Sequence, residues 1–295
     1  PHVYDLTAPT SNPEVLVFVH GWMLSRSYWQ PLIEQLSVDY QCVSYDLRGF
    51  GQSQPRDRSP EVNAHPSGNG VIATQNATLA TTAEQIAQYS LLSYARDLGM
   101  LLRELKIPQA WLIGHSLGGC VALWAADQMP EQIQGVICLN SGGGIYLKEV
   151  FERFRSAGQQ MVKLRPKWLS QVPCLDLVFT RANVVSKIER AWGRQRVLDF
   201  VRANADAAIG TLLDSTTEAE VHRLPQVVAR LSQPLYFIAG AQDTVMEPKY
   251  VHHLASFHPL FGDCADNVFE IANCGHLSML EKTDVVEAHI RQILQ

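Results

Sequence analysis

The sequence Gly114-His115-Ser116-Leu117-Gly118-Gly119 stands between a short apolar run, Ala110 to Ile113, and an apolar segment of helical period, Leu117 to Gln128. A serine with a glycine two residues to either side, in a strand–turn–helix setting, is typical of a turn that presents a nucleophile. Side chains at the two flanking positions would collide with the strand and the helix, and glycine removes those collisions. The following helix points its N-terminus at the serine, which favours a developing negative charge. The pattern predicts that Ser116 is a catalytic nucleophile.

The same alternation of apolar runs and helical periods extends along most of the chain. It predicts an α/β fold with a mostly parallel central sheet and helices on both faces. The expected strands are Val15–His20, Gln41–Asp46, Ala110–Ile113, Gly135–Leu139, Leu235–Ala239 and Val268–Ile271. The expected helices that cover the sheet are Trp29–Leu36, Leu91–Leu105, Leu117–Gln128, Tyr250–Ala255 and Asp284–Leu294.

Two stretches interrupt this alternation. Residues 52–90 are rich in Ser, Pro, Asn, Gly and Thr and lack a sustained apolar period, which predicts a loop insertion near the rim of the site. Residues 143–230 are helical in period and predict a helical cap inserted in the core. The core then comprises residues 1–142 and 231–295.

A serine is a weak nucleophile at neutral pH and needs an adjacent imidazole that is itself oriented by a carboxylate. Asp243 follows the expected strand Leu235–Ala239, and His276 follows the next strand. Both therefore lie at the carboxyl ends of parallel strands, where such sheets build their sites. The other position for the acid holds Asn140, which cannot stabilise an imidazolium as a carboxylate does. The sequence predicts a triad of Ser116, Asp243 and His276.

A tetrahedral intermediate also needs two hydrogen-bond donors that face its oxygen. The backbone N–H of Leu117, immediately after the nucleophile, is one candidate. The second is the backbone N–H of Trp22 in His20-Gly21-Trp22, where Gly21 lets the chain fold back toward Ser116 at the end of an early strand. We expect Trp22 and Leu117 to form the oxyanion hole.

Taken together, these motifs resemble those of the α/β-hydrolase family from about Val15 to the C-terminus. The matching elements are His20-Gly21-Trp22, Asp46 to Ser53, Gly114 to Gly119, Asp243 and Gly275-His276. The resemblance implies a sheet of about eight strands, a helical cap and no cofactor. Within the family the motifs are similar to the branch of the pimeloyl-carrier-protein methyl esterases, to small-ester carboxylesterases and to chlorophyll-ester hydrolases. Haloalkane dehalogenases and epoxide hydrolases of this fold carry Asp at the position of Ser116, which excludes them.

The chemistry expected of this site is hydrolysis of a carboxylic ester through an acyl-enzyme intermediate. The same triad also serves thioesterases, lactonases, acyltransferases and hydrolases of long-chain lipid or chlorophyll-type esters, and the sequence leaves these alternatives open. An alternative from another class is a receptor-like protein that retains the triad but acts as a ligand sensor.

The charge distribution bears on possible partners. The whole chain has a net charge of −5, which argues against nucleic acid as a partner. Residues 143–203 nevertheless carry twelve Lys or Arg and five Asp or Glu, a net charge of +7. We expect either an ordinary solvated helical face or a surface that meets an anionic carrier protein or lipid surface, alongside a small-molecule or acyl-ester substrate.

The remaining composition is that of an ordinary globular protein, with 46% apolar and 18% charged residues. No apolar run approaches the roughly 18 residues of a transmembrane helix. The six cysteines have no metal-ligand spacing, and the sequence indicates no metal site. Scattered thiols and the lack of a signal segment favour a cytoplasmic location, with peripheral membrane association through the basic cap as an option.

Overall fold

A computed structural model describes residues 2–55, 87–142, 148–262 and 267–295, with the backbone alone at 148–151 and 153–154. The described residues form a seven-stranded sheet in the order β1-β3-β2-β4-β5-β6-β7. β1 is antiparallel to β3, and every other neighbouring pair is parallel. The mostly parallel sheet is therefore confirmed. Its strands are Tyr4–Leu6 (β1), Val15–Val19 (β2), Gln41–Tyr45 (β3), Ala110–His115 (β4), Ile133–Leu139 (β5), Leu235–Gly240 (β6) and Val268–Ile271 (β7).

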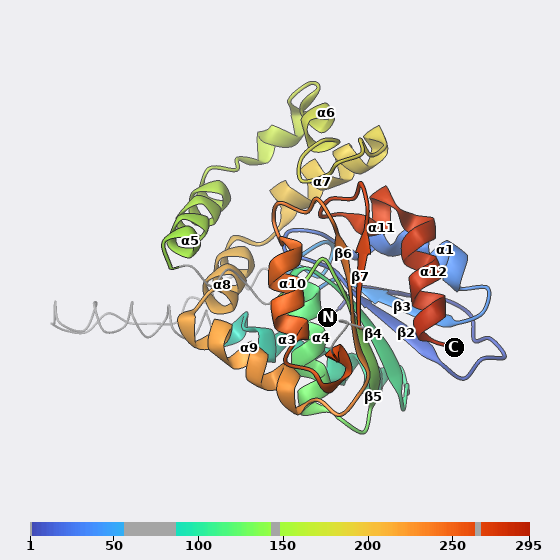
Figure 1. Cartoon of the computed structure of the whole chain (residues 1–295). Helices are drawn as coiled ribbons and strands as arrows, with labels where there is room; N and C mark the ends of the chain where they lie inside the picture. Colours follow the sequence, from blue (N-terminus) through green and yellow to red (C-terminus); the bar gives the residue numbers. More distant parts are fainter. Residues whose placement is uncertain (1, 56–86, 143–147, 263–266) are drawn as a thin grey trace, which may run out of the picture.

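Helices cover both faces of the sheet, so its central strands are buried on both sides (Figure 1). In β2 the side chains of Val15, Val17 and Val19 join one apolar cluster, while Leu16 and Phe18 join the other. This alternation follows from the two-residue period of a strand. The first cluster includes side chains of Leu91–Glu104 (α3), Leu117–Gln128 (α4) and Pro248–Ala255 (α10), and the second includes side chains of Gln30–Leu36 (α1), Ser278–Glu281 (α11) and Thr283–Ile293 (α12).

A long helical segment lies between β5 and β6. Its helices are Lys148–Lys163 (α5), Leu175–Phe179 (α6), Arg190–Arg202 (α7), Ala205–Ser215 (α8) and Glu218–Arg230 (α9), with a short 3-10 helix at Lys167–Gln171 (η2). In Figure 1, α5, α6 and α7 stand beyond the sheet, whereas α9 runs beside α4 and α10. Glu220 on α9 accepts a hydrogen bond of 2.5 Å from the indole of Trp124 on α4. The division of the chain at residues 143 and 230 stays a prediction.

The observed elements differ from the expected ones in a few places. Seven strands lie in the described part of the chain, against about eight implied by the resemblance, because the segment before Val15 contributes only the three-residue edge strand β1. The short helices Arg26–Trp29 (η1), Pro259–Phe261 (η3) and α11 span too few residues to show a helical period. Of the expected insertion at 52–90, residues 56–86 lie outside the described residues. Within the described part, no helix is long and apolar enough to cross a membrane.

Candidate active site

Ser116 lies in a sharp turn between β4 and α4, with a backbone φ of 52° and ψ of −119°. Positive φ is strained for a residue other than glycine and is often found at functional sites. The turn depends on its glycines: a Cβ atom on Gly118 would lie 2.1 Å from the carbonyl oxygen of Val19, and one on Gly114 would lie 2.4 Å from the carbonyl oxygen of Gly118. Backbone atoms cannot move aside at such distances, so the turn requires glycine at both positions.

The structure brings the three expected triad residues together. The Nε2 atom of His276 is 3.2 Å from the Oγ atom of Ser116, and Nδ1 of His276 is 2.7 Å from Oδ2 of Asp243. A carboxylate accepts hydrogen bonds, so His276 donates from Nδ1, which leaves Nε2 free to accept the serine proton. The three residues follow β4, β6 and β7, whose carboxyl ends lie at one edge of the sheet.

The carboxylate of Asp243 is buried and accepts several hydrogen bonds. Its Oδ1 accepts hydrogen bonds from the backbone N–H groups of Val245 and Met246, at 2.8 and 2.9 Å. Burial by itself raises the pKa of this carboxyl, but the hydrogen bond and charge of His276 and the two backbone donors outweigh burial and hold the pKa below its usual range. Asp243 therefore remains a carboxylate at neutral pH, as an orienting acid must.

A further side chain at this edge is that of Asn140, which the sequence excludes as the acid of the triad. It follows β5, and its amide donates to Oδ2 of Asp243 at 3.0 Å and to the carbonyl of Gly275 at 2.9 Å. Its own Oδ1 accepts a hydrogen bond of 2.5 Å from the buried hydroxyl of Ser278. Its place directly after a strand was a usable signal, but the sequence could not show that its amide would reach the acid.

His115, in the turn itself, supports the base. Its Nε2 is 2.7 Å from the carbonyl oxygen of His276 and donates to it, and the ring is almost fully buried. Burial and the neighbouring His276 lower the pKa of His115 to about 3, so the ring is neutral at physiological pH. The backbone N–H of His276 in turn donates to the carbonyl of Asn183 at 2.9 Å. The carbonyl and the N–H of His276 are therefore both held, one by the His115 side chain and the other by the backbone of Asn183.

The two expected oxyanion donors belong to two segments of the chain that meet at Ser116. Leu117 is the first residue of α4, where an N–H group has no partner within its helix. A Cβ atom on Gly21 would lie 3.2 Å from Cβ of Ser116, so the loop that carries Trp22 runs directly beside the nucleophile. The indole of Trp22 donates to the carbonyl of Ala208 on α8 at 2.9 Å, which fixes this loop to the inserted segment.

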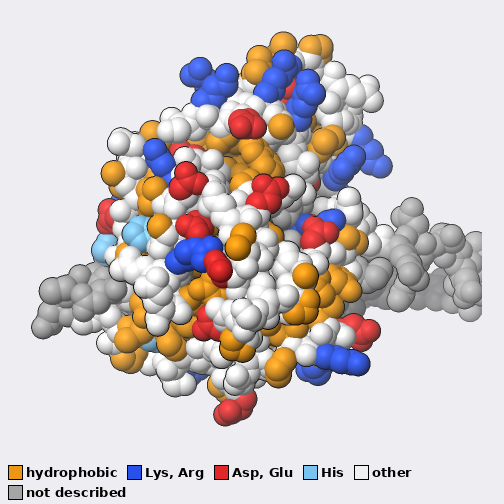
Figure 2. Space-filling view, turned by 90° about the vertical axis from the view of Figure 1, so that its right-hand side faces the viewer, with side chains coloured by type: hydrophobic (Ala, Val, Ile, Leu, Met, Phe, Trp, Pro, Cys, Tyr) orange, Lys and Arg blue, Asp and Glu red, His pale blue; other side chains and the backbone are white. Residues whose placement is uncertain are grey.

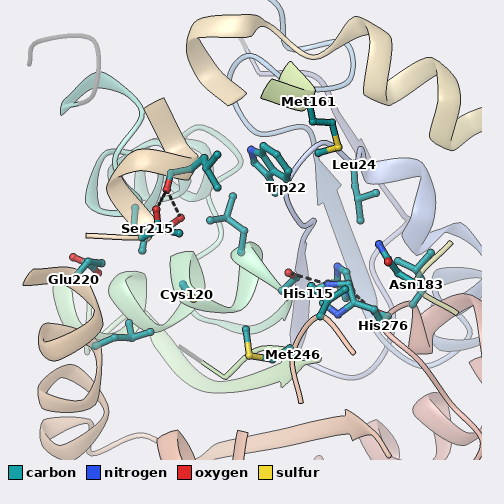
Figure 3. A pocket seen from close by; sticks show the side chains of 18 of the residues that line it. Trp22, Leu24, His115, Cys120, Met161, Asn183, Ser215, Glu220, Met246 and His276 are labelled. Carbon is teal, nitrogen blue, oxygen red and sulfur yellow. Dashed lines mark hydrogen bonds between the residues drawn. The ribbon is translucent and has the colours of Figure 1, made fainter. Parts of the chain in front are cut away.

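A cavity of about 360 Å³ opens over Ser116 and His276 (Figure 3). Figure 3 places His276 and Asn183 toward one end of it, and Ser215 and Glu220 at the other. Most of the lining between them is apolar. The apolar lining residues are Trp22, Leu24, Leu91, Leu117, Met161, Leu212, Leu224, Val245, Met246 and Leu277. Among the described residues, no three His, Cys, Asp or Glu side chains are grouped so that they could hold a metal ion.

The chain is similar to known proteins of one fold family. A sequence model of the family described as alpha/beta hydrolase fold matches residues 14–283. The chain belongs to the α/β-hydrolase fold family. This α/β-hydrolase is 24% identical to a Bacillus subtilis protein named uncharacterized hydrolase YugF, over 96% of this chain and 92% of the relative. It is also 24% identical to the pimeloyl-[acyl-carrier protein] methyl ester esterase of Aliivibrio salmonicida, over 95% of this chain and 92% of the relative.

The fold is shared with solved structures of the family. A thermophilic esterase from Thermogutta terrifontis superposes on this α/β-hydrolase with a TM-score of 0.69, at 21% sequence identity, over 99% of this chain and 92% of the esterase. The likeness extends over nearly the whole chain, including the helical segment between β5 and β6.

Proposed function

We propose that the protein hydrolyses carboxylic esters through an acyl-enzyme intermediate, with Ser116 as nucleophile, His276 as general base and acid, and Asp243 as the orienting carboxylate. The observation that carries the proposal is the continuous hydrogen-bonded chain from Ser116 Oγ through His276 to Asp243, at 3.2 and 2.7 Å. It lies at a largely apolar cavity large enough for a small ester.

In the acylation step, Oγ of Ser116 attacks the ester carbonyl carbon while Nε2 of His276 takes the hydroxyl proton. The carbonyl oxygen becomes negative and accepts hydrogen bonds from the backbone N–H groups of Trp22 and Leu117. As the tetrahedral intermediate collapses, the bond to the alcohol oxygen breaks, and His276 gives its proton to the leaving alcohol. Each oxyanion donor typically contributes about 3 kcal/mol to the transition state.

In the deacylation step, a water molecule takes the place of the alcohol. His276 removes one of its protons as the oxygen attacks the acyl carbon, and the same oxyanion donors stabilise the second intermediate. The bond to Ser116 Oγ then breaks, His276 returns the proton to the serine, and the carboxylic acid leaves. Asp243 stays ionised throughout and stabilises the imidazolium that forms twice in each cycle.

The test is hydrolysis of p-nitrophenyl esters from acetate to palmitate by the wild type and by Ser116→Ala. We expect the turnover number to fall by about a million-fold in the variant, since removal of a triad nucleophile has that effect. The chain-length optimum of the wild type would rank small esters against long-chain lipid or chlorophyll-type esters. Hydrolysis that persists in Ser116→Ala would contradict the proposal.

The alternative chemistries of the same triad are separated by parallel assays with thioesters, lactones and an added acceptor alcohol. A thioesterase or lactonase would show the higher kcat/KM on its own substrate class, and an acyltransferase would transfer the acyl group to the alcohol in preference to water. A receptor-like protein would instead react once and retain the acyl group on Ser116, which mass spectrometry of the intact protein would detect.

The inserted segment between β5 and β6 exposes basic and apolar side chains together. Its exposed basic side chains include Lys163, Lys167 and Arg181, and they stand among apolar side chains that are also exposed, Leu164 by 76% and Trp168 by 61%. Figure 2 shows Lys and Arg side chains gathered at the end of the molecule that carries α6 and α7, with apolar side chains between them. Basic and apolar groups together favour an anionic lipid surface over an acidic carrier protein. We propose that this face contacts such a surface.

A further inference from the structure

The cavity over Ser116 is lined by one arginine, Arg196 of α7, among its described residues. Only 9% of Arg196 is exposed. Its Nη1 donates to the backbone carbonyls of Phe179 and Ala182, at 2.6 and 2.7 Å. The next residue, Asn183, accepts the backbone N–H of His276. Arg196 is therefore bonded to the backbone turn that leads into Asn183, which Figure 3 places beside His276.

A second arginine of the inserted segment, Arg165, is half-buried and serves as a structural comparison. Its three guanidinium nitrogens all donate to backbone carbonyls, those of Val162, Phe200 and Ala203. Arg165 does not line the cavity. In Arg196, by contrast, only Nη1 has hydrogen-bond partners among the described residues, so Nε and Nη2 retain their donors. Every guanidinium nitrogen of Arg165 thus donates to a carbonyl, whereas Nε and Nη2 of Arg196 have no acceptor among the described residues.

No carboxylate of the described residues forms an ion pair with Arg196 within 4.0 Å. Burial lowers the pKa of Arg196, and the charges of Tyr28 and Glu281 offset this only in part. The two oxygens of Glu281 accept backbone N–H groups of residues 185, 186, 275 and 277. Asp199, one turn further along α7, accepts from Ser25 and Gln195. Glu220, the acidic residue that lines the cavity, stands at the opposite end (Figure 3).

A guanidinium that is removed from water without an anionic partner is unfavourable, because its lost hydration is not replaced. A bound carboxylate would supply both the opposite charge and acceptors for Nε and Nη2, and the planar guanidinium matches a carboxylate with two parallel hydrogen bonds. Because Arg196 and Ser116 line the same cavity, one ligand can contact both residues.

We propose that Arg196 binds a carboxylate on the substrate, so that the preferred substrate is an ester that also carries a free carboxylate, such as the monoester of a dicarboxylic acid. The inference rests on the proposed function, since it places the ester carbonyl at Ser116 and the carboxylate at the His276 end of the same cavity. The carboxylate takes no part in bond making or breaking and acts by binding alone.

The test compares pairs of methyl esters that differ only at the far end of the acyl chain. Monomethyl adipate ends in a carboxylate where methyl hexanoate ends in a methyl group, and monomethyl succinate, glutarate and pimelate have corresponding partners. Methanol release gives kcat/KM for each. We expect the wild type to prefer the acidic member of at least one pair by about tenfold or more, mainly through a lower KM, because a charge-assisted bidentate contact contributes that much.

In Arg196→Gln this preference should fall about 10- to 100-fold, and in Arg196→Lys it should fall by less, because the charge remains while the planar fork is lost. Arg165→Gln is the matched control and should keep the wild-type preference. The ratio within a pair is the readout, because any disturbance of the Phe179–Asn183 turn and His276 affects both esters alike. Should Arg196→Gln not fold, Arg196→Lys carries the comparison.

Two results would overturn the subsite: a wild type that treats both members of every pair alike, or variants of Arg196 that keep the full preference. A wild type that cleaves none of these esters would count against the proposed function, and the subsite is then tested by binding alone. Calorimetric titration with succinate, glutarate, adipate and pimelate should show binding to the wild type and to Arg165→Gln that Arg196→Gln weakens at least tenfold. Equal binding by all three proteins, or binding by none, would reject the subsite.

Discussion

The amide nitrogen of Asn140 is 3.0 Å from Oδ2 of Asp243 and donates to it, although the two residues follow different strands of the sheet. The same nitrogen donates to the carbonyl of Gly275, the residue before the proposed base. One buried amide therefore links the loop of the acid to the loop of the base, and it is itself held by Ser278. Asn140 touches no reacting atom of the proposed mechanism and is a positioning residue.

Replacing Asn140 by alanine should lower kcat about tenfold or more on the preferred p-nitrophenyl ester, with a smaller change in KM. The loops of Asp243 and His276 would lose their common support, and small misplacements of catalytic groups are costly. Asn267→Ala is the matched control: Asn267 is equally buried and donates to the carbonyl of Leu235, away from the triad. If both variants lose stability alike but also keep the same kcat, the positioning role is wrong.

The buried carboxyl of Asp199 should make the free energy of unfolding depend on pH. It is 3% exposed, and burial raises its pKa to about 6, although hydrogen bonds from Gln195 and Ser25 act in the opposite direction. An unfolded aspartate has a pKa of about 3.9. Between these values the folded state holds a proton that the unfolded state has lost. The contribution to stability is therefore fully present below about pH 4 and is lost as the pH rises through 6.

Asp199→Asn removes this ionisation and keeps an acceptor for Ser25. We expect the variant to exceed the wild type in free energy of unfolding by roughly 1 to 3 kcal/mol at pH 8, with much less difference near pH 4. Urea unfolding at pH 4, 6 and 8 measures this. A difference that is the same at all three pH values would contradict the assigned titration.

The glycines of the nucleophile turn give a third prediction. A Cβ on Gly118 would lie 2.1 Å from the carbonyl oxygen of Val19, which is backbone, whereas a Cβ on Gly99 in α3 would lie 2.6 Å from Sδ of Met129, the end of a flexible side chain. Gly118→Ala should therefore cost more than about 3 kcal/mol of stability and abolish ester hydrolysis, because overpacking against backbone cannot relax.

The matched variant Gly99→Ala adds the same methyl group to another helix. It should stay within about 1 kcal/mol of the wild type, because Met129 can move and alanine favours the helix. Thermal unfolding of both variants, with activity on p-nitrophenyl acetate, makes the comparison. Similar losses in the two proteins would mean that the contact with Val19 has no special importance.

The basic and apolar face of the inserted segment gives the fourth prediction. The triple variant Lys163→Glu, Lys167→Glu, Arg181→Glu should bind vesicles containing phosphatidylglycerol at least about 100-fold more weakly than the wild type, since each basic residue near an anionic membrane contributes about 1 kcal/mol. Co-sedimentation at low and physiological salt measures the partitioning, with phosphatidylcholine vesicles as the uncharged comparison.

The control is the triple variant Arg103→Glu, Lys106→Glu, Lys249→Glu, which changes the net charge by the same amount. These exposed residues lie on or next to α3 and α10, outside the inserted segment. It should retain most of the vesicle binding. Equal losses in the two triple variants would assign the effect to overall charge, and a wild type that ignores anionic vesicles would reject the lipid surface.

The sequence predicted most of the core and the three side chains of the proposed triad, and the reason is geometric. Parallel strands end at a common edge, so residues that follow β4, β6 and β7 must lie near one another whatever the separation along the chain. Ser116, Asp243 and His276 could be found from their places after these strands. The period of the apolar residues gave the element types, while the bounds differed by a few residues because helix and strand ends depend on local hydrogen bonds.

What the sequence could not show were contacts between elements that no period relates. The hydrogen bond from His115 to the backbone of His276 and the hydrogen bond from Asn140 to Asp243 both depend on how loops pack. The difference between Arg165 and Arg196 is of the same kind: both are arginines of the inserted segment, and only the tertiary structure shows which one has unused donors at the cavity.

The backbone hydrogen bond from His276 to Asn183 has a consequence for protein engineering. Asn183 belongs to the segment between β5 and β6, so this segment supplies a hydrogen-bond acceptor for the backbone of His276. Exchanging the segment between relatives would therefore also change the support of His276. A chimera with a foreign segment would need to return a carbonyl oxygen to this place, or its imidazole would lose alignment whatever substrate the new cavity fitted. Libraries aimed at new specificities should therefore vary the side chains that line the cavity and keep the main chain of the turn at residues 179–183.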